Sequence, residues 1–368
     1  SDPFRQEEFL VQSRGMGTWV QLRLADRLGI FARAKFRFPA DTIWMILRGF
    51  VEDCPKKNLF TKEVMAWKIF DLLSGRIERD PEVFASLARY IGEGEKRNGD
   101  RTFRLCRQIA FLFDSYLTYR PELILDWQAG KLPSGGDLWQ GLLWKDLRSA
   151  LDQKSLPELV NGLENEPTPI HPERMPERLS VFGISTLPPV FLNVLEAYGR
   201  FRPLRVYALQ PAPVMWGEVQ SEKTLQKNWK ERALERAKGQ AGRPVGEDEL
   251  NEERGNPLIG SLGRTGREFF NLLVDRNAHD EPLDFREPEG DSLLARLQRW
   301  TFEVFSDQPE ERKPLSRTDE SITINSCHGP MREAEVLRDY LLRRFAEDST
   351  LRPRDVVVMM PDPEGYAP

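Results

Sequence analysis

The sequence predicts an α/β protein: a parallel sheet interrupted by a large all-helical insertion, and then the start of a second α/β domain. Three observations indicate this class. Short apolar runs followed by amphipathic stretches occur near the N-terminus and again at residues 179–209, residues 42–163 show mainly helical periodicity, and a third strand–helix–strand pattern begins near residue 321. At 368 residues the chain has the length of two or three domains.

The first strand–helix unit begins with the apolar run Glu8–Gln12. The glycine-bearing turn SRGMGT follows, and then a helix with Val20, Leu24 and Leu28 on one face and Gly29 where helices commonly stop. A parallel sheet normally has more strands before such a unit, and only seven residues precede Glu8. We therefore expect a first strand to be missing from the chain as given.

Helical segments and a proline-rich linker set the expected domain boundaries. The linker NEPTPIHPERMPE contains four prolines and leads to a strand at Val181–Ile184. Near the end, a strand at Ile322–Asn325, a helix with an apolar stripe at 336–341 and a strand at 355–360 predict a new α/β unit. We expect one domain formed by residues 1–45 and 166–320, with a mobile insertion near 220–255. The helical insertion would span residues 46–165, and residues 321–368 would begin a second domain.

Composition excludes several classes of function. The net charge of −5 argues against a polybasic nucleic-acid coat, so any DNA contact must be local. Three cysteines, Cys54, Cys106 and Cys327, support neither a disulfide framework nor a CxxC metal site and fit a reducing compartment. No apolar run approaches the length of a membrane span, and the N-terminus has no signal-peptide pattern. We expect a cytoplasmic protein without a membrane partner.

The chemistry of a nucleotide-hydrolysing domain is missing. The unit at 179–209 has the strand–helix–strand spacing of such a domain, yet Gly183 and Ile184 stand where an acidic pair would hold magnesium, and the chain has no GxxxxGK[ST] loop. Cys327 and His328 are adjacent and would point to opposite faces of a strand, so they could not act together as a nucleophile and its base. Asp280–Glu281 lies in a polar stretch without a strand, which does not support a metal site. We therefore expect no catalytic, metal or cofactor site in this chain.

One segment is locally basic and aromatic. Between Arg5 and Arg37 seven cations stand against three acids, and Phe31, Phe36, Phe38 and Trp44 are interleaved with them. Cations with aromatic rings are the combination that binds single-stranded nucleic acid. The alternative is a half-buried strand whose arginines face water. A second candidate is LFDSYLTYRP (112–121), where Asp114 and Arg120 could contact bases or phosphate; the alternative there is a surface ion pair at a helix end.

Seven ordered blocks resemble the RecC family, the gamma chains of exodeoxyribonuclease V. They are FLVQSRGMGTWVQLRLADRLGI, FPADTIWMIL, LFDSYLTYRP, LSVFGISTLPPVFLNVLEAYG, YALQPAPVMWGE, GNPLIGSLGRTGREFFNLL and SCHGPMREAEVLRDYLL. They cover nearly the whole chain and correspond to the N-terminal part of the family. Only Lys223–Glu253 and Gln153–Asn161 look unlike it.

The resemblance implies the fold of a superfamily 1 helicase, P-loop NTPase-like, whose ATPase motifs have decayed. Domain 1A would be split by the helical block, which would be 1B, and the tail would begin 2A. It also implies a chain that hydrolyses no ATP, bridges RecB-like and RecD-like subunits that use ATP and magnesium, channels single-stranded DNA from a duplex end, and scans it for the Chi hotspot in double-strand-break repair and recombination.

The resemblance also implies which residues contact DNA. Gln12, Trp44, Leu112, Asp114 and Arg120 match residues of the strand-scanning channel, and Arg14, Thr18, Phe38 and Phe111 stand at channel positions with a different side chain. One family arginine has no counterpart in the shortened region 153–161, which puts Chi readout or its sequence in doubt. Two other possibilities are open: a scaffold of the same complex that only docks proteins, and an AddB-type subunit with a nuclease and an iron–sulfur cluster farther along.

Overall fold

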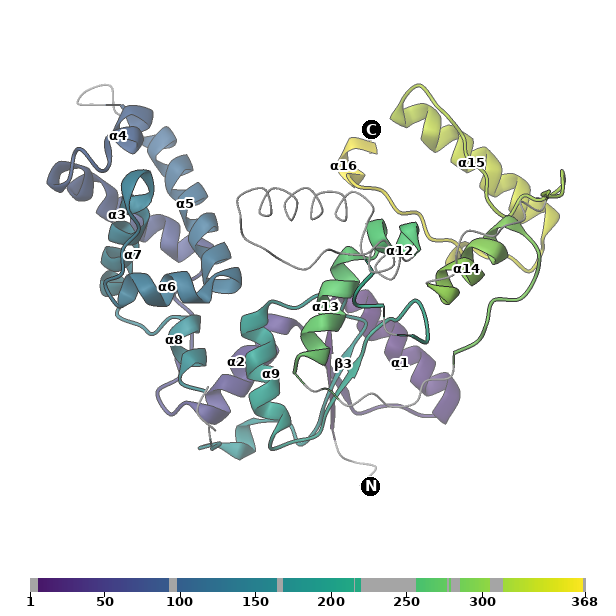
Figure 1. The fold of residues 1–368 in the computed structure, drawn as a ribbon, viewed down its shortest axis with the longest axis horizontal. Coiled ribbons are helices and arrows are strands. Elements are labelled where there is room, and N and C mark those ends of the chain that lie inside the picture. Colours follow the sequence, from purple (N-terminus) through teal and green to yellow (C-terminus); the bar gives the residue numbers. More distant parts are fainter. Residues whose placement is uncertain are drawn as a thin grey trace, which may run out of the picture.

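The computed structural model contains a sheet with helices on both faces and a separate block of helices (Figure 1). Hydrophobic clusters lie on each face of the sheet and inside the block. The structure describes residues 6–92, 98–163, 168–214, 216–219, 256–276, 278, 285–304 and 314–366. The insertion expected near 220–255, and the Asp280–Glu281 pair, lie outside these residues.

The sheet has four parallel strands in the order β2-β1-β3-β4. Their bounds are β1 Glu7–Val11, β2 Ala34–Arg37, β3 Leu179–Phe182 and β4 Leu204–Tyr207. The predicted parallel α/β sheet is therefore confirmed, although β3 lies two residues earlier than expected. It ends at Phe182 because Gly183 takes a φ of +64°, which a strand does not accommodate.

Both faces of the sheet are covered, because alternate residues of β1 point to opposite sides. Leu10 packs with α2 (Pro39–Phe50) and α9 (Pro189–Gly199), whereas Phe9 and Val11 pack with α1 (Arg14–Leu28). Figure 1 shows α1 on the side of the sheet away from α2 and α9. Helix α1 covers β1 and β2, and a cavity of about 750 Å³ lies between α1 and the exposed face of β3 and β4.

The predicted helical insertion is present. Its helices are α3 (Lys62–Arg79), α4 (Ala85–Ile91), α5 (Gly99–Tyr119), α6 (Pro121–Gln128) and α7 (Leu138–Leu151). Their shared core is centred on Trp144, whose ring lies 5.5 Å from that of Phe60 and 5.3 Å from that of Phe113. Helix α2, and α8 (Leu156–Asn161) at the other end, pack on the core of the sheet.

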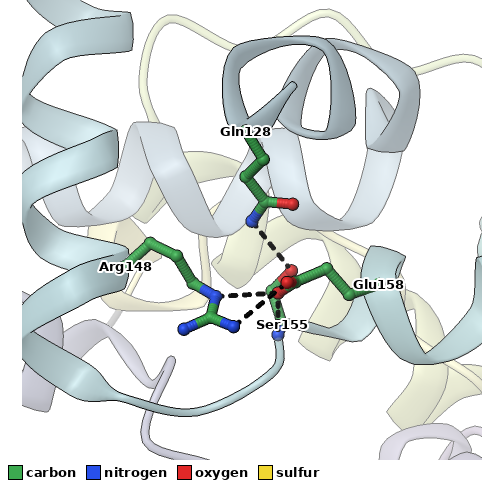
Figure 2. Close-up of polar contacts among 4 residues, drawn as sticks. All are labelled: Gln128, Arg148, Ser155 and Glu158. Atoms are coloured by element: carbon green, nitrogen blue, oxygen red, sulfur yellow. Dashed lines mark hydrogen bonds and ion pairs between the residues drawn. The ribbon is translucent and has the colours of Figure 1, made fainter. Parts of the chain in front are cut away.

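A polar cluster joins the block to α8 (Figure 2). Arg148 donates through Nε and Nη2 to the two carboxylate oxygens of Glu158, at 2.9 and 3.1 Å, and the Ser155 backbone amide donates to the same carboxylate at 2.6 Å. Gln128 of α6 donates to the Ser155 hydroxyl. Burial raises the pKa of Glu158, but the hydrogen bonds from Arg148 and Ser155 outweigh it and hold that pKa below its ordinary value.

Helices dominate the rest of the chain. They are α12 (Pro257–Leu262), α13 (Arg264–Val274), α14 (Leu293–Glu303), α15 (Pro330–Glu347) and α16 (Pro363–Tyr366), with 3₁₀ turns at Gly135–Asp137, Pro172–Arg174 and Pro353–Asp355. Helix α13 extends the layer of α2 and α9, because Phe269 joins their core and Arg276 donates to Asn193 at 2.7 Å. None of the described helices combines the length and apolarity needed to cross a bilayer.

The prediction of strands at 322–325 and 355–360 is wrong. Helix α15 forms between them as predicted, but neither flanking segment pairs with another strand. Ile324 and Val357 are 93% and 80% exposed. A strand needs a neighbour for its backbone N–H and C=O groups. In the part of the chain that the structure describes, no segment lies beside either of them as a neighbouring strand.

Candidate nucleic-acid interface

The carboxyl ends of the four parallel strands form one edge of the sheet, called here the carboxyl edge. Gln12, Phe38, Gly183 and Ala208 are the residues that directly follow β1, β2, β3 and β4. In open α/β sheets ligands bind outside this edge, because loops and helix N-termini converge there. The sequence-predicted residues Gln12, Arg14, Thr18 and Phe38 all belong to the segments that leave it.

The turn from β1 to α1 is too short and too occupied to hold a nucleotide phosphate. Only Gln12 and Ser13 separate strand from helix. The Met16 amide donates to the Ser13 hydroxyl and the Gly17 amide to the Ser13 carbonyl, each at 3.2 Å. A phosphate loop needs such amides free. The Met16 and Gly17 amides are therefore not free for a phosphate.

The end of β3 has no room for the missing acid. Gly183 has a φ of +64°, and a Cβ built on it would lie 3.2 Å from Cε of Met16. Both the backbone conformation and the Met16 side chain therefore disfavour an aspartate at this position.

Around this turn, side chains that can meet a nucleic acid are exposed. Gln12, Arg14 and Thr18 face solvent, and the Thr18 hydroxyl donates to the Arg14 carbonyl at 3.2 Å. Arg14 stands in the first turn of α1, where the helix dipole also favours an anion. The combination suits a phosphodiester.

The aromatic residues of the basic segment divide into two groups. Phe31 and Phe36 pack on Phe9, with ring centroids 6.1 and 5.3 Å apart, so the strand alternative holds for Phe36 of β2, whereas Phe31 lies before that strand. Phe38 is exposed at the start of α2, and Trp44 lies partly buried one turn further, packed against the core of α2 and α9. Phe38 and the open side of Trp44 can stack on a base, and so can Trp19 of α1, which lies in the same segment and is 50% exposed.

The end of α5 carries the second set of predicted residues. Leu112 and Asp114 are half-buried, and Asp114 pairs with Lys62 of α3 at 3.3 Å. Arg120 is exposed at the break between α5 and α6, where Pro121 ends the first helix, and its guanidinium lies 5.9 Å from the Tyr116 ring. The ion-pair alternative thus holds for Asp114, although its partner is Lys62 and not Arg120.

Of the first set only Trp44 lies on α2, which contacts α9 as α5 does, whereas Gln12 and Arg14 lie around the start of α1 on the other side of the sheet. Among the described side chains, no hydrogen bond or ion pair joins Gln12, Arg14 or Trp44 to Leu112, Asp114 or Arg120; the last three lie on the helical block and the first three on the sheet domain. Sequence reasoning missed Lys62, because no spacing rule connects it to Asp114.

The described residues include no group of three His, Cys, Asp or Glu side chains arranged to hold a metal ion. Cys327 is partly buried and His328 exposed, at the start of the segment that leads to α15. Burial raises the pKa of the Cys54 thiol, partly offset by Arg48, so this cysteine is not activated. The cavity beside α1 lies along the sheet face and reaches Phe182 and Tyr207, the last residues of β3 and β4.

Residues 1–303 match the family described as "RecC, N-terminal domain". The RecBCD enzyme subunit RecC of Escherichia coli (strain K12) is 34% identical over 100% of this chain and 35% of its own length. The subunits of the same name from Haemophilus influenzae and Mycolicibacterium smegmatis are 32% and 34% identical over 100% of this chain and 36% and 31% of their own lengths. The chain spans about a third of the length of these relatives.

Proposed function

The chain belongs to the RecC N-terminal domain family, and from this premise we propose that it is the strand-guiding part of a RecC subunit in a RecBCD-type helicase–nuclease. In this role it is a superfamily 1 helicase fold without ATPase function. RecB-like and RecD-like subunits use ATP and magnesium to move the DNA, and this chain receives single-stranded DNA from a duplex end during double-strand-break repair and recombination.

The observation that carries the proposal is the composition of the carboxyl edge. A nucleotide-hydrolysing domain would present phosphate-binding amides and an acid there. Here Ser13 occupies the amides, Gly183 replaces the acid, and exposed Gln12, Arg14 and Phe38 stand around them. The edge is thus suited to polar and stacking contacts with a strand and unsuited to nucleotide hydrolysis.

Each residue has a role that its surroundings support. Arg14 and Arg120 are exposed cations that can bind phosphates, which position a strand without reading it. Gln12 can hydrogen-bond base edges, and Phe38 and Trp44 can stack on bases. Asp114 stands at a channel position by the family resemblance, and a base contact there would compete with its ion pair to Lys62. One good base contact discriminates by about 1–3 kcal/mol, so several together could pause a motor at a hotspot such as Chi.

Replacements at four positions bear on which sequence is read. By the family resemblance Arg14, Thr18, Phe38 and Phe111 stand at channel positions with a different side chain. Arg14 would contact phosphate, so a change of readout would come from Thr18, Phe38 and Phe111. Since base contacts specify and phosphate contacts position, we propose that the channel is kept and that its preferred sequence differs.

The test uses the full-length protein assembled with its partner subunits. A photoreactive single-stranded tail should crosslink to this chain, and Trp44→Ala and Arg120→Ala should each weaken tail binding. Tyr90→Ala and Arg101→Ala are controls, since Tyr90 is an exposed ring of α4 and Arg101 lies at the far end of α5. A nucleotide titration of the full-length subunit alone should show neither binding nor hydrolysis. Unchanged tail binding in both variants would remove these residues from the channel.

A second candidate is a scaffold that docks partner proteins and never touches DNA. Exposed aromatic side chains on the helical block favour it, among them Trp67, Phe111 and Tyr119, which are 59%, 60% and 67% exposed. Labelling of this chain by the photoreactive tail would exclude pure scaffolding. An AddB-type subunit is not proposed, because the relatives reported above are named RecC.

A further inference from the structure

Two helices of the block share an aromatic cluster on their outer surface. Trp67 of α3 lies 4.5 Å from Phe103 of α5, and Phe70 lies 6.2 Å from Trp67 and 6.1 Å from Phe103, measured between ring centroids. Trp67 is 59% exposed, although the block has a large core that could have buried it. Large aromatic side chains left at a surface in a group mark a binding site more often than a single exposed one does.

The cluster continues along α5 toward the residues already assigned to DNA. Phe103, Arg107 and Phe111 follow each other at intervals of four, and Asp114 comes three residues later, so all four share one flank of the helix. Eight residues of helix separate Phe103 from Phe111 by roughly 12 Å. We call the surface formed by Lys62, Trp67, Phe70, Phe103, Arg107 and Phe111 the α3/α5 strip.

Cations alternate with rings along the strip. The Lys62 ammonium lies 4.9 Å from the Phe111 ring centroid and 3.3 Å from the Asp114 carboxylate. Arg107 is exposed between Phe103 and Phe111, and no ion pair or hydrogen bond of the described residues engages its guanidinium. Two exposed acids, Glu63 and Asp71, flank Trp67 on α3. On the α5 side Arg107 is an exposed cation between two rings, and a cation there complements a phosphodiester backbone.

We propose that the α3/α5 strip is a second binding segment for single-stranded DNA, which continues the path from Asp114 outward over the helical block. Bases stack on Trp67, Phe103 and Phe111, and Arg107 and Lys62 contact the phosphates between them. The inference rests on the proposed function, since it extends the same path.

Two features favour a strand over a partner protein at this surface. The cores of protein–protein interfaces are depleted of lysine. Lys62 nevertheless belongs to this surface, because its ammonium contacts both Phe111 and Asp114. The strip is also continuous with the assigned residues, because Lys62 bridges from α3 to Asp114. Sequence-independent strand binding typically uses this pairing of stacking rings with cations along a groove or surface.

The test measures binding of tailed duplexes by the full-length protein in its assembled complex, as a function of tail length. Trp67→Ala and Phe103→Ala should each weaken binding of long tails by roughly 5- to 150-fold, the range that alanine substitution of a stacking ring gives. Tails too short to pass Asp114 should bind with unchanged affinity. Arg107→Ala should lower the slope of log K against log salt by about 0.7.

Controls separate stacking from folding. Trp67→Tyr keeps an aromatic face and should retain most of the affinity. Tyr90→Ala removes an aromatic side chain of α4 that is 45% exposed, and Arg101→Ala removes an exposed cation of α5 that lies off the strip. Neither should change binding of long tails.

The results distinguish the strip from the proposed function. If Trp67→Ala and Phe103→Ala bind long tails normally while Trp44→Ala and Arg120→Ala do not, the strip lies off the path and the inference fails alone. If none of the four variants affects binding, the proposed function fails as well. If the strip variants release a partner subunit in sedimentation while intact complexes bind tails normally, the strip is a protein interface and the inference is overturned.

Discussion

Met16 lies against Gly183: a Cβ on Gly183 would stand 3.2 Å from Met16 Cε and 3.4 Å from Sδ, and the Gly183 backbone has a φ of +64°. Met16 lies in the first turn of α1 after β1, and Gly183 directly follows β3, so the two positions face each other across neighbouring strands. The Met16 side chain fills the space beside the end of β3.

Gly183→Asp should therefore destabilise the protein without creating a magnesium site. A side chain at this φ costs about 1 kcal/mol or more, and the contact with Met16 adds to it. Urea unfolding of the chain should show the loss, and Met16→Ala combined with Gly183→Asp should recover the part due to crowding. A Gly183→Asp protein of unchanged stability would contradict the packing described here.

Stability should depend on the ionisation of Glu158. Its pKa is held below the ordinary value in the folded state, so the stabilisation is complete above the unfolded-state pKa of roughly 4.3 and is lost as pH falls through the folded pKa. Glu158→Gln should cost about 1–2 kcal/mol at neutral pH, because Arg148 then loses a charged partner. Urea titrations at several pH values should show a weaker acid dependence in Glu158→Gln than in the parent protein.

The core of the helical block should tolerate Trp144→Phe far better than Trp144→Ala. Trp144 is fully buried, so truncation to alanine should cost about 3–5 kcal/mol. Its indole N–H is buried without a hydrogen-bond partner among the described residues, and phenylalanine removes that unsatisfied donor while it keeps part of the ring volume. Denaturation of the two variants, with exposed Trp67→Phe as a control within about 0.5 kcal/mol of the parent, measures the difference.

Arg14 should contribute more to strand binding than Arg23, although both lie on α1. Arg14 stands at the carboxyl edge, whereas Arg23 lies 5.7 Å from the Trp19 ring beside the cavity on the sheet face. In the assembled full-length protein, Arg14→Ala should lower the salt slope of tail binding by about 0.7, the value for one phosphate contact to a single strand. Equal effects of Arg14→Ala and Arg23→Ala would argue against a path confined to the carboxyl edge.

Much of the architecture could be predicted, because helical and strand periodicities are local. The helix after β1, its end at Gly29 and the helical block follow from apolar spacing and a C-terminal glycine. The strands at 322–325 and 355–360 could not be judged this way. Apolar residues there favour extended chain, but a strand also requires a neighbour, which the pattern of one segment does not supply.

The candidate site was predictable only in part. The family resemblance pointed to Gln12, Arg14, Thr18 and Phe38, and the structure places all four after β1 or β2 at the same edge of the sheet. Phe31 and Phe36 looked the same as Phe38 in the sequence, yet they pack on Phe9. Composition indicates that a ring is present, whereas its burial depends on the strand beside it.

The sequence by itself determined most of the helices, the family and the absence of a GxxxxGK[ST] loop. Each of these depends on residues that are close together in the sequence. Only the tertiary structure decided that Met16 fills the space beside Gly183, that Lys62 pairs with Asp114, and that Trp67 meets Phe103 at the surface. The helical period states which residues share a face of one helix. It does not state which face of a distant helix they meet, since that depends on how the whole chain packs.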